Sequence, residues 1–90
     1  VTLRARGVTA RVFAERRFHE SQRTVGRTPR TTRQPETVII ELRVASGRGL
    51  SRFILSWGPD VEVLSPPSLR REIAEAHRAA LACYEDAREQ

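Results

Sequence analysis

The sequence predicts an α+β fold, a ferredoxin-like βαββαβ sandwich with an additional C-terminal helix. Segments with apolar residues at every second position alternate with segments whose apolar residues recur every three or four positions. Their order is strand, helix, strand, strand, helix, strand and helix. Split βαβ units of this kind place two helices on one face of a four-stranded antiparallel sheet, with the first and third strands at its centre. A length of 90 residues allows one domain, so we expect residues 1–90 to form it.

The first strand and helix are predicted within the opening 18 residues. Apolar and polar residues alternate over residues 1–6, which is typical of a strand with one buried face. Thr9 is expected to cap a helix that continues to Phe18. Residues 19–26 hold few apolar side chains, so a strand in this segment should lie at the edge of the sheet.

A polar loop and the strongest strand follow. Residues 27–35 contain no apolar side chain except two prolines, and their arginines repel one another, so we expect an exposed, mobile loop. Residues 37–44 are rich in β-branched side chains and predict a strand. One face of this strand carries Val38, Ile40, Leu42 and Val44.

The second half predicts a helix, a short strand and a final helix. Residues 50–57 carry one apolar stripe at positions i, i+3, i+4 and i+7. Gly58 is suited to the left-handed conformation that follows a helix. A short strand is expected over residues 60–64, and Ser68 is expected to cap a helix with an apolar side through Tyr84.

One sheet face is expected to carry no helix. The residues that alternate with the buried set would line it: Thr2, Arg4, Arg6, Ile39, Glu41, Arg43, Glu62 and Leu64. Arg4, Arg6 and Arg43 would then lie near one another, where guanidinium groups repel unless an acid or an anion separates them. Glu41 and Glu62 could separate them; a phosphate backbone or a partner subunit is the alternative.

Positive charge is concentrated in the first third of the chain. There are 16 cationic residues against 11 acidic ones, all of the cations are arginine, and the net charge is +5. Residues 1–35 alone hold nine arginines against two glutamates. Such asymmetry indicates a polyanionic partner, because guanidinium groups that neutralise phosphates release counterions. The alternative is that these arginines are ordinary solvated surface cations without a binding role, and the absence of lysine from the chain favours this alternative. The residues expected to contact nucleic acid are Arg4, Arg6, Arg23, Arg27, Arg30 and Arg33.

The sequence offers little support for catalysis, and we expect neither an enzyme nor a cofactor. His77 and Cys83 share the last predicted helix but lie about 120° apart on it, so they cannot form a nucleophile–base pair. Two histidines are too few for a metal site, and no glycine-rich phosphate motif follows a strand. A single cysteine and the lack of any long apolar run favour a cytoplasmic protein without a membrane span.

Residues 50–70 carry a family resemblance. A helix that ends in Trp-Gly is followed by the strand Val-Glu-Val-Leu, a proline turn, Leu-Arg, and a helix that closes at Tyr84. This pattern resembles the C-terminal extension (WCX) domain of WYL-domain bacterial transcriptional regulators. The matching positions are Leu50, Phe53, Leu55, Gly58, Val61, Val63, Leu64, Pro66, Leu69, Arg70 and Tyr84. The opening strand and the helix through Val12 fit as well.

The resemblance implies a parent protein with a winged helix-turn-helix, a WYL domain and this module last, and a chain that begins with Val1 agrees with a fragment. Members of the family respond to single-stranded DNA or other nucleic-acid ligands. Their extension is associated with dimerisation and with completing the effector site. The resemblance therefore implies a non-enzymatic regulatory module of a DNA-binding regulator. A purely structural homodimerisation domain and a sensor of metabolites between subunits are the alternatives.

Overall fold

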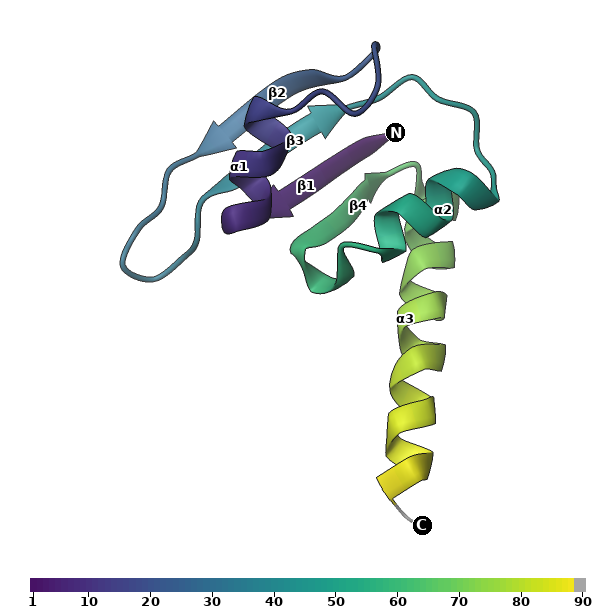
Figure 1. Cartoon of the computed structure of the whole chain (residues 1–90). Helices are drawn as coiled ribbons and strands as arrows, with labels where there is room; N and C mark the ends of the chain where they lie inside the picture. Colours follow the sequence, from purple (N-terminus) through teal and green to yellow (C-terminus); the bar gives the residue numbers. More distant parts are fainter. Residues whose placement is uncertain (89–90) are drawn as a thin grey trace.

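The computed structural model describes the backbone of residues 1–88 and side chains through residue 85. Its elements are β1 (Thr2–Arg6), α1 (Val8–Glu15), β2 (Arg23–Thr28), β3 (Thr37–Glu41), α2 (Arg48–Leu55), a 3₁₀ turn (Gly58–Asp60), β4 (Val61–Ser65) and α3 (Pro67–Arg88) (Figure 1). The four strands form one antiparallel sheet in the order β2-β3-β1-β4. The first and third strands are therefore central, and the predicted α+β fold with a C-terminal helix is confirmed.

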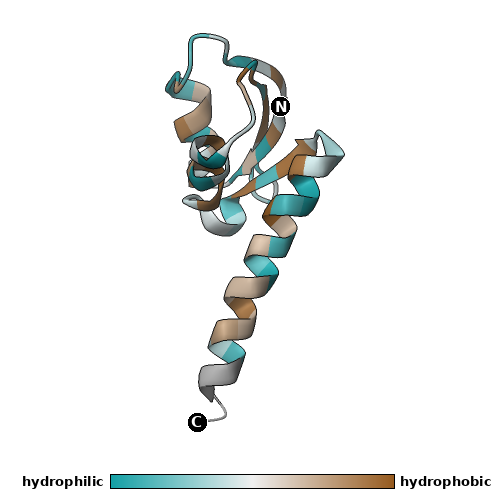
Figure 2. Ribbon diagram, turned by 90° about the vertical axis from the view of Figure 1, so that its right-hand side faces the viewer, coloured by the Kyte–Doolittle hydropathy of each residue, from teal (hydrophilic) through white to brown (hydrophobic). Residues whose placement is uncertain are grey.

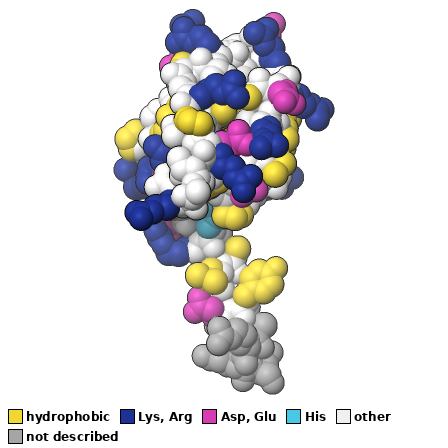
Figure 3. Space-filling view, turned by 90° about the vertical axis from the view of Figure 1, so that its left-hand side faces the viewer, with side chains coloured by type: hydrophobic (Ala, Val, Ile, Leu, Met, Phe, Trp, Pro, Cys, Tyr) yellow, Lys and Arg dark blue, Asp and Glu magenta, His cyan; other side chains and the backbone are white. Residues whose placement is uncertain are grey.

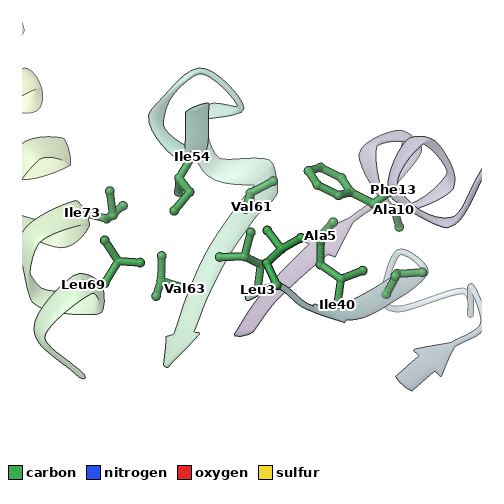
Figure 4. Packing of buried hydrophobic residues seen from close by; sticks show 12 residues of the cluster. Leu3, Ala5, Ala10, Phe13, Ile40, Ile54, Val61, Val63, Leu69 and Ile73 are labelled. Carbon is green, nitrogen blue, oxygen red and sulfur yellow. The ribbon is translucent and has the colours of Figure 1, made fainter. Parts of the chain in front are cut away.

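The core lies between this sheet and the helices α1 and α2, which pack on one of its faces (Figure 1). Leu3 and Ile40 from the two central strands point toward Phe13 of α1 and Ile54 of α2, and all four side chains are buried (Figure 4). The full buried set is Leu3, Ala5, Ala10, Phe13, Val38, Ile40, Leu42, Ile54, Val61, Val63, Leu69 and Ile73. Apolar residues at alternate positions of β1, β3 and β4 thus supply one face of the core, as predicted.

Helix α1 differs from the prediction at both ends. Gly7 is its N-cap, with a φ of 66°, so Thr9 lies inside the first turn, where its buried hydroxyl donates to Asp60 Oδ2 at 3.1 Å. The helix ends at Glu15 rather than near Phe18. The amide of Gln22 explains this end, because its Nε2 donates to the main-chain oxygens of Phe13 and Arg16, each at 3.0 Å. A side chain thus takes the place of the next helical turn.

Strand β2 is an edge strand, as predicted, but it includes Arg27 and Thr28, which we expected in the loop. The exposed loop is shorter and spans residues 29–36. Strand β3 ends at Glu41, earlier than predicted. Beyond it, the main chain of Arg43 bonds to Ser21 Oγ instead of to a strand: its N donates at 2.9 Å and its O accepts at 3.3 Å.

The later elements shift by a few residues. Helix α2 begins at Arg48 and ends at Leu55, before Trp57. Gly58 adopts a φ of 59°, which confirms its predicted left-handed conformation, and it opens the 3₁₀ turn. Helix α3 begins at Pro67, so Ser68 lies in its first turn and is not the cap that we predicted.

Helix α3 leaves the domain after its first turns. Leu69 and Ile73 are buried beside Val63 and Ile54, and the rest of the helix projects away from the sheet (Figures 1, 2 and 4). On the projecting part, Leu81 is 56% exposed and Tyr84 is 74% exposed. Among the described residues, no helix has the length and hydropathy needed to cross a membrane.

Candidate nucleic-acid interface

Three arginines surround one carboxylate on the sheet face opposite α1 and α2, called the open face below. The register of β1 and β4 places Arg4 directly opposite Glu62. Arg4 Nη1 and Arg6 Nη2 donate to Glu62 Oε1 at 3.1 and 2.8 Å, and Arg70 Nη1 from α3 donates to Oε2 at 2.9 Å. One carboxylate cannot neutralise three guanidinium groups, so this cluster leaves two positive charges on the open face.

The titration of Glu62 reflects this surplus. Partial burial by itself would raise the pKa of the Glu62 carboxyl. The hydrogen bond from Arg70 and the charges of Arg4, Arg70 and Arg6 outweigh burial, so the pKa lies below its ordinary value. Within the described residues, Arg6 Nε is buried and has no hydrogen-bond partner. This buried atom is out of reach of a ligand, but Glu62 bonds to only one terminal nitrogen of each arginine, so the other terminal nitrogens of Arg4, Arg6 and Arg70 carry donors that Glu62 does not use.

The predicted group of Arg4, Arg6 and Arg43 does not form. Arg4 of β1 lies opposite Ile39 of β3. Arg43 follows Ile39 by four residues, so it lies about 13 Å farther along the chain than the position opposite Arg4. Arg43 is exposed beyond the end of β3. Arg70, which was not among the predicted site residues, is the third cation of the cluster; the resemblance over residues 50–70 is the one sequence signal that singled it out.

Arg23 and Arg27 lie apart from this cluster. Arg23 is on the open face, but its Nη2 is paired with Glu41 Oε1 at 2.8 Å. Arg27 is opposite Val38, a buried residue of the helix-bearing face, so it lies on the other side of the sheet. Neither residue therefore adds a free charge to the open face.

The loop between β2 and β3 carries Arg30 and Arg33. Both are exposed, and neither forms an ion pair with any described residue. The loop has a defined turn, because Thr31 N donates to Gln34 O at 2.9 Å and Gln34 N donates to Thr31 Oγ1 at 3.0 Å. These two guanidinium groups are thus available and are presented by a local hydrogen-bonded turn.

Two polar hollows lie on either side of this loop and share Gln34 and Pro35. One, of about 510 Å³, is lined on the open face by Arg4, Arg6, Thr28, Gln34, Pro35, Thr37 and Ile39. The other, of about 480 Å³, is lined by Gly7, Val8, Arg11 and residues 30–36. Arg11 Nε is paired with Glu36 Oε1 at 2.5 Å, which leaves Arg30 and Arg33 as the free cations of the second hollow.

Figure 3 shows the domain from the side of this loop, where arginine side chains are spread over the surface with acidic side chains among them. The structure therefore brings together Arg4 and Arg6, joined by Arg70, and places Arg30 and Arg33 across the loop from them. Arg23 and Arg27 are not part of this surface. No group of three or more metal-ligating side chains is found in the described part of the chain.

The profile of the WCX domain family matches residues 1–81, about nine tenths of the chain. The chain belongs to the WCX domain family. It is thus a regulatory domain of the WYL-type proteins, as the resemblance implied. No curated protein matches the chain.

In this WCX domain, most positions that carry the resemblance shape the fold. Val61, Val63 and Leu69 are buried, and Gly58 has a positive φ. Arg70 is different: it is exposed, and it bonds both to Glu62 and to the main-chain oxygen of Val63. It is therefore the family-matching position that adds charge to the open face.

Proposed function

We propose that this WCX domain is a non-enzymatic regulatory module that supplies arginine contacts to a single-stranded nucleic-acid effector of a WYL-type, DNA-binding transcriptional regulator. The observation that carries the proposal is the surplus of charge around Glu62, where Arg4, Arg6 and Arg70 share one carboxylate. Partly buried guanidinium groups with unused donors are suited to phosphate oxygens, which they can bind with two parallel hydrogen bonds.

The loop extends this interface. A nucleic-acid backbone that meets Arg4 and Arg6 on the open face can pass over Gln34 and reach Arg30 and Arg33, because the two hollows share this part of the loop. The same effector would then neutralise charges in both hollows. The preceding WYL domain of the parent chain is expected to supply the remainder of the effector site.

The mode of contact follows from the side chains on the open face. Ile39 occupies its centre, and among the described residues no aromatic side chain lines the hollow beside Arg4 and Arg6. Base stacking of the kind found in aromatic RNA-binding sheets is therefore not available here. We expect phosphate contacts, with stacking of guanidinium planes on bases, and little dependence on base sequence.

A purely structural homodimerisation domain is the second candidate. The exposed apolar residues Leu81 and Tyr84 on the projecting part of α3 favour it, because large apolar side chains on a helix normally pack against something. Dimerisation and effector contact use different parts of the domain and are compatible with each other. The regulator is thus expected to act as a homodimer.

Fluorescence anisotropy of the regulator that carries this domain tests the proposal, with single- and double-stranded oligonucleotides at two salt concentrations. The doubly substituted variant Arg30→Ala/Arg33→Ala should bind single strands more weakly, and the slope of log affinity against log salt should fall by about 1.4 because two phosphate contacts are lost. The matched control Arg48→Ala/Arg52→Ala removes the same charge from exposed positions of α2. Equal affinity and equal slope for both variants would show that the loop is merely solvated.

A further inference from the structure

A third hollow, of about 280 Å³, lies between the outer edge of β4 and the first half of α3, which run beside each other (Figure 1). The turn residues Gly58 and Pro59 line one side of it, and Ala74 and His77 of α3 line another. With the two polar hollows beside the loop it shares only Arg6. It is called the edge hollow below, and it has room for one nucleobase.

The main-chain hydrogen bonds of β1 determine which groups of β4 lie at its outer edge. Val1 and Leu42 exchange two main-chain hydrogen bonds, at 2.9 and 2.8 Å. Opposed residues in an antiparallel pair alternate between bonded and non-bonded pairs, so the main-chain groups of Arg4, three residues later, point away from β3 and toward β4. Arg4 lies opposite Glu62, which therefore directs its own main-chain groups to β1.

The neighbours of Glu62 present their main-chain groups to the edge hollow. Val61 and Val63 point these groups away from β1, and Val63 O accepts from Arg70 Nη1 at 2.8 Å on that side. Their side chains are buried in the core, so they line the edge hollow through the main chain. Within the described part of the chain, no residue forms a hydrogen bond to Val61 O or to Val63 N. An acceptor and a donor are thus adjacent and unpaired on this edge.

An adjacent acceptor and donor match the polar edge of every nucleobase. Adenine and cytosine carry an amino donor next to a ring-nitrogen acceptor, whereas guanine and thymine carry a ring N–H donor next to a carbonyl acceptor. Each of them can therefore bond to Val61 O and Val63 N at the same time. A site of this kind accepts any base, which agrees with the weak dependence on base sequence expected of the arginine contacts.

We propose that the edge hollow takes one nucleobase of the single-stranded effector, with the polar edge of the base on β4 and its two faces against His77 and Pro59. This inference rests on the proposed function and names the part of the effector that the edge hollow binds. The half-buried imidazole of His77 supplies a flat ring on which a base can stack, and the ring of Pro59 gives an apolar surface on the other side.

The charge around the edge hollow fits the phosphates that flank such a base. Arg6 and Arg70 both line it, and Glu62 bonds to one terminal nitrogen of each. The remaining terminal nitrogens can donate to phosphate oxygens of the same strand. A hydrocarbon ligand would leave these donors and the main-chain pair of β4 without partners, which is unfavourable. A nucleotide within a strand satisfies the stacking surface, the main-chain pair and the guanidinium groups together.

Anisotropy titrations of the regulator that carries this domain test the inference with two single strands of equal length. One strand is oligothymidine, and the other has an abasic tetrahydrofuran unit at every position, so it keeps the phosphates and lacks the bases. Oligothymidine should bind at least roughly 5-fold more tightly. Ala74→Leu fills the edge hollow without a change of charge, so it should remove most of this difference and leave the affinity for the abasic strand unchanged. Ala79→Leu, at an exposed position of α3 outside the edge hollow, should keep the difference.

Substitutions of His77 give a second readout. His77→Ala should weaken binding of oligothymidine roughly 5-fold and leave binding of the abasic strand unchanged, because only a base can stack on the ring. His77→Phe keeps a flat ring and should restore the affinity for oligothymidine. Circular dichroism checks that each variant remains folded.

The two strands separate failure of this site from failure of the proposed function. If Ala74→Leu and His77→Ala left the difference between the strands unchanged, or weakened both strands equally, base insertion would be overturned, and the phosphate contacts measured with the abasic strand would stand. If neither strand bound to the regulator, the proposed function would be overturned together with this site.

Discussion

The guanidinium group of Arg70 donates to the carboxylate of Glu62 at 2.9 Å and to the main-chain oxygen of Val63 at 2.8 Å. These two bonds attach the first turn of α3 to the edge strand β4. They also bring a third cation to a carboxylate that Arg4 and Arg6 already share. Glu62 thus holds the open face together and, at the same time, occupies guanidinium donors that an incoming phosphate would use.

Glu62→Gln is therefore expected to strengthen binding of single-stranded nucleic acid. The substitution removes the one negative charge among Arg4, Arg6 and Arg70, so a phosphate no longer competes with a carboxylate for their donors. We expect a gain in affinity of roughly 3- to 10-fold at low salt, measured by anisotropy, and a smaller gain at high salt because salt screens the added charge. Glu75→Gln, which removes a charge from α3 away from the open face, is the control. Unchanged or weaker binding by Glu62→Gln would contradict a phosphate site at this cluster.

The same carboxylate gives a pH dependence of stability. The pKa of Glu62 is lower in the folded chain than in the unfolded chain, where a glutamate titrates near pH 4.3. The stabilisation is therefore complete above about pH 4.3 and is lost as the pH falls through the lower, folded pKa. At pH 6–7, Glu62→Gln should lower the free energy of unfolding by about 1–2 kcal/mol. Urea denaturation should show this difference shrinking below pH 4; a difference that stays constant down to pH 3 would contradict the network.

The face of each regular strand could be predicted from sequence, because alternation in β1, β3 and β4 decides which side chains are buried. The same logic fails in β2. By alternation, Arg27 should share a face with Arg23, but a bulge between Thr24 and Gly26 shifts the register and moves Arg27 to the helix side. Strand β2 has almost no buried side chain, so no hydrophobic pattern marks where the bulge falls.

Helix ends and cross-element contacts depended on residues far apart in sequence. Thr9 was expected to cap α1, but its hydroxyl bonds to Asp60, 51 positions away. Arg4 and Arg6 were correctly placed near Glu62, because adjacent strands bring alternate residues together. The contribution of Arg70 depends on the angle at which α3 leaves β4, and no local periodicity encodes that angle.

Gln22→Ala is expected to destabilise the domain by about 1–3 kcal/mol. The buried amide of Gln22 bonds to the main-chain oxygens of Phe13 and Arg16, and its Oε1 accepts from Phe18 N at 2.8 Å. Removing it leaves main-chain groups at the end of α1 without their partners. Gln34→Ala, at an exposed loop position, should change the free energy of unfolding by less than about 0.5 kcal/mol. Urea denaturation measures the free energy of unfolding of both variants. If the two values were equal, water would satisfy the main-chain groups at the end of α1 as well as the Gln22 amide does.

Two glycines permit a test of backbone conformation alone. Gly58 has a φ of 59°, and a Cβ added there would meet no atom within 4 Å, so Gly58→Ala introduces strain without a clash. We expect a loss of about 1–2 kcal/mol in the free energy of unfolding, since a left-handed conformation is unfavourable for any residue with a Cβ. Gly47 also has open space around it, but its φ of 163° is extended. Gly47→Ala should therefore leave stability unchanged or raise it by about 0.4–1 kcal/mol, because the unfolded chain loses freedom. If both substitutions lowered the urea midpoint equally, the turn at Gly58 would not require a positive φ.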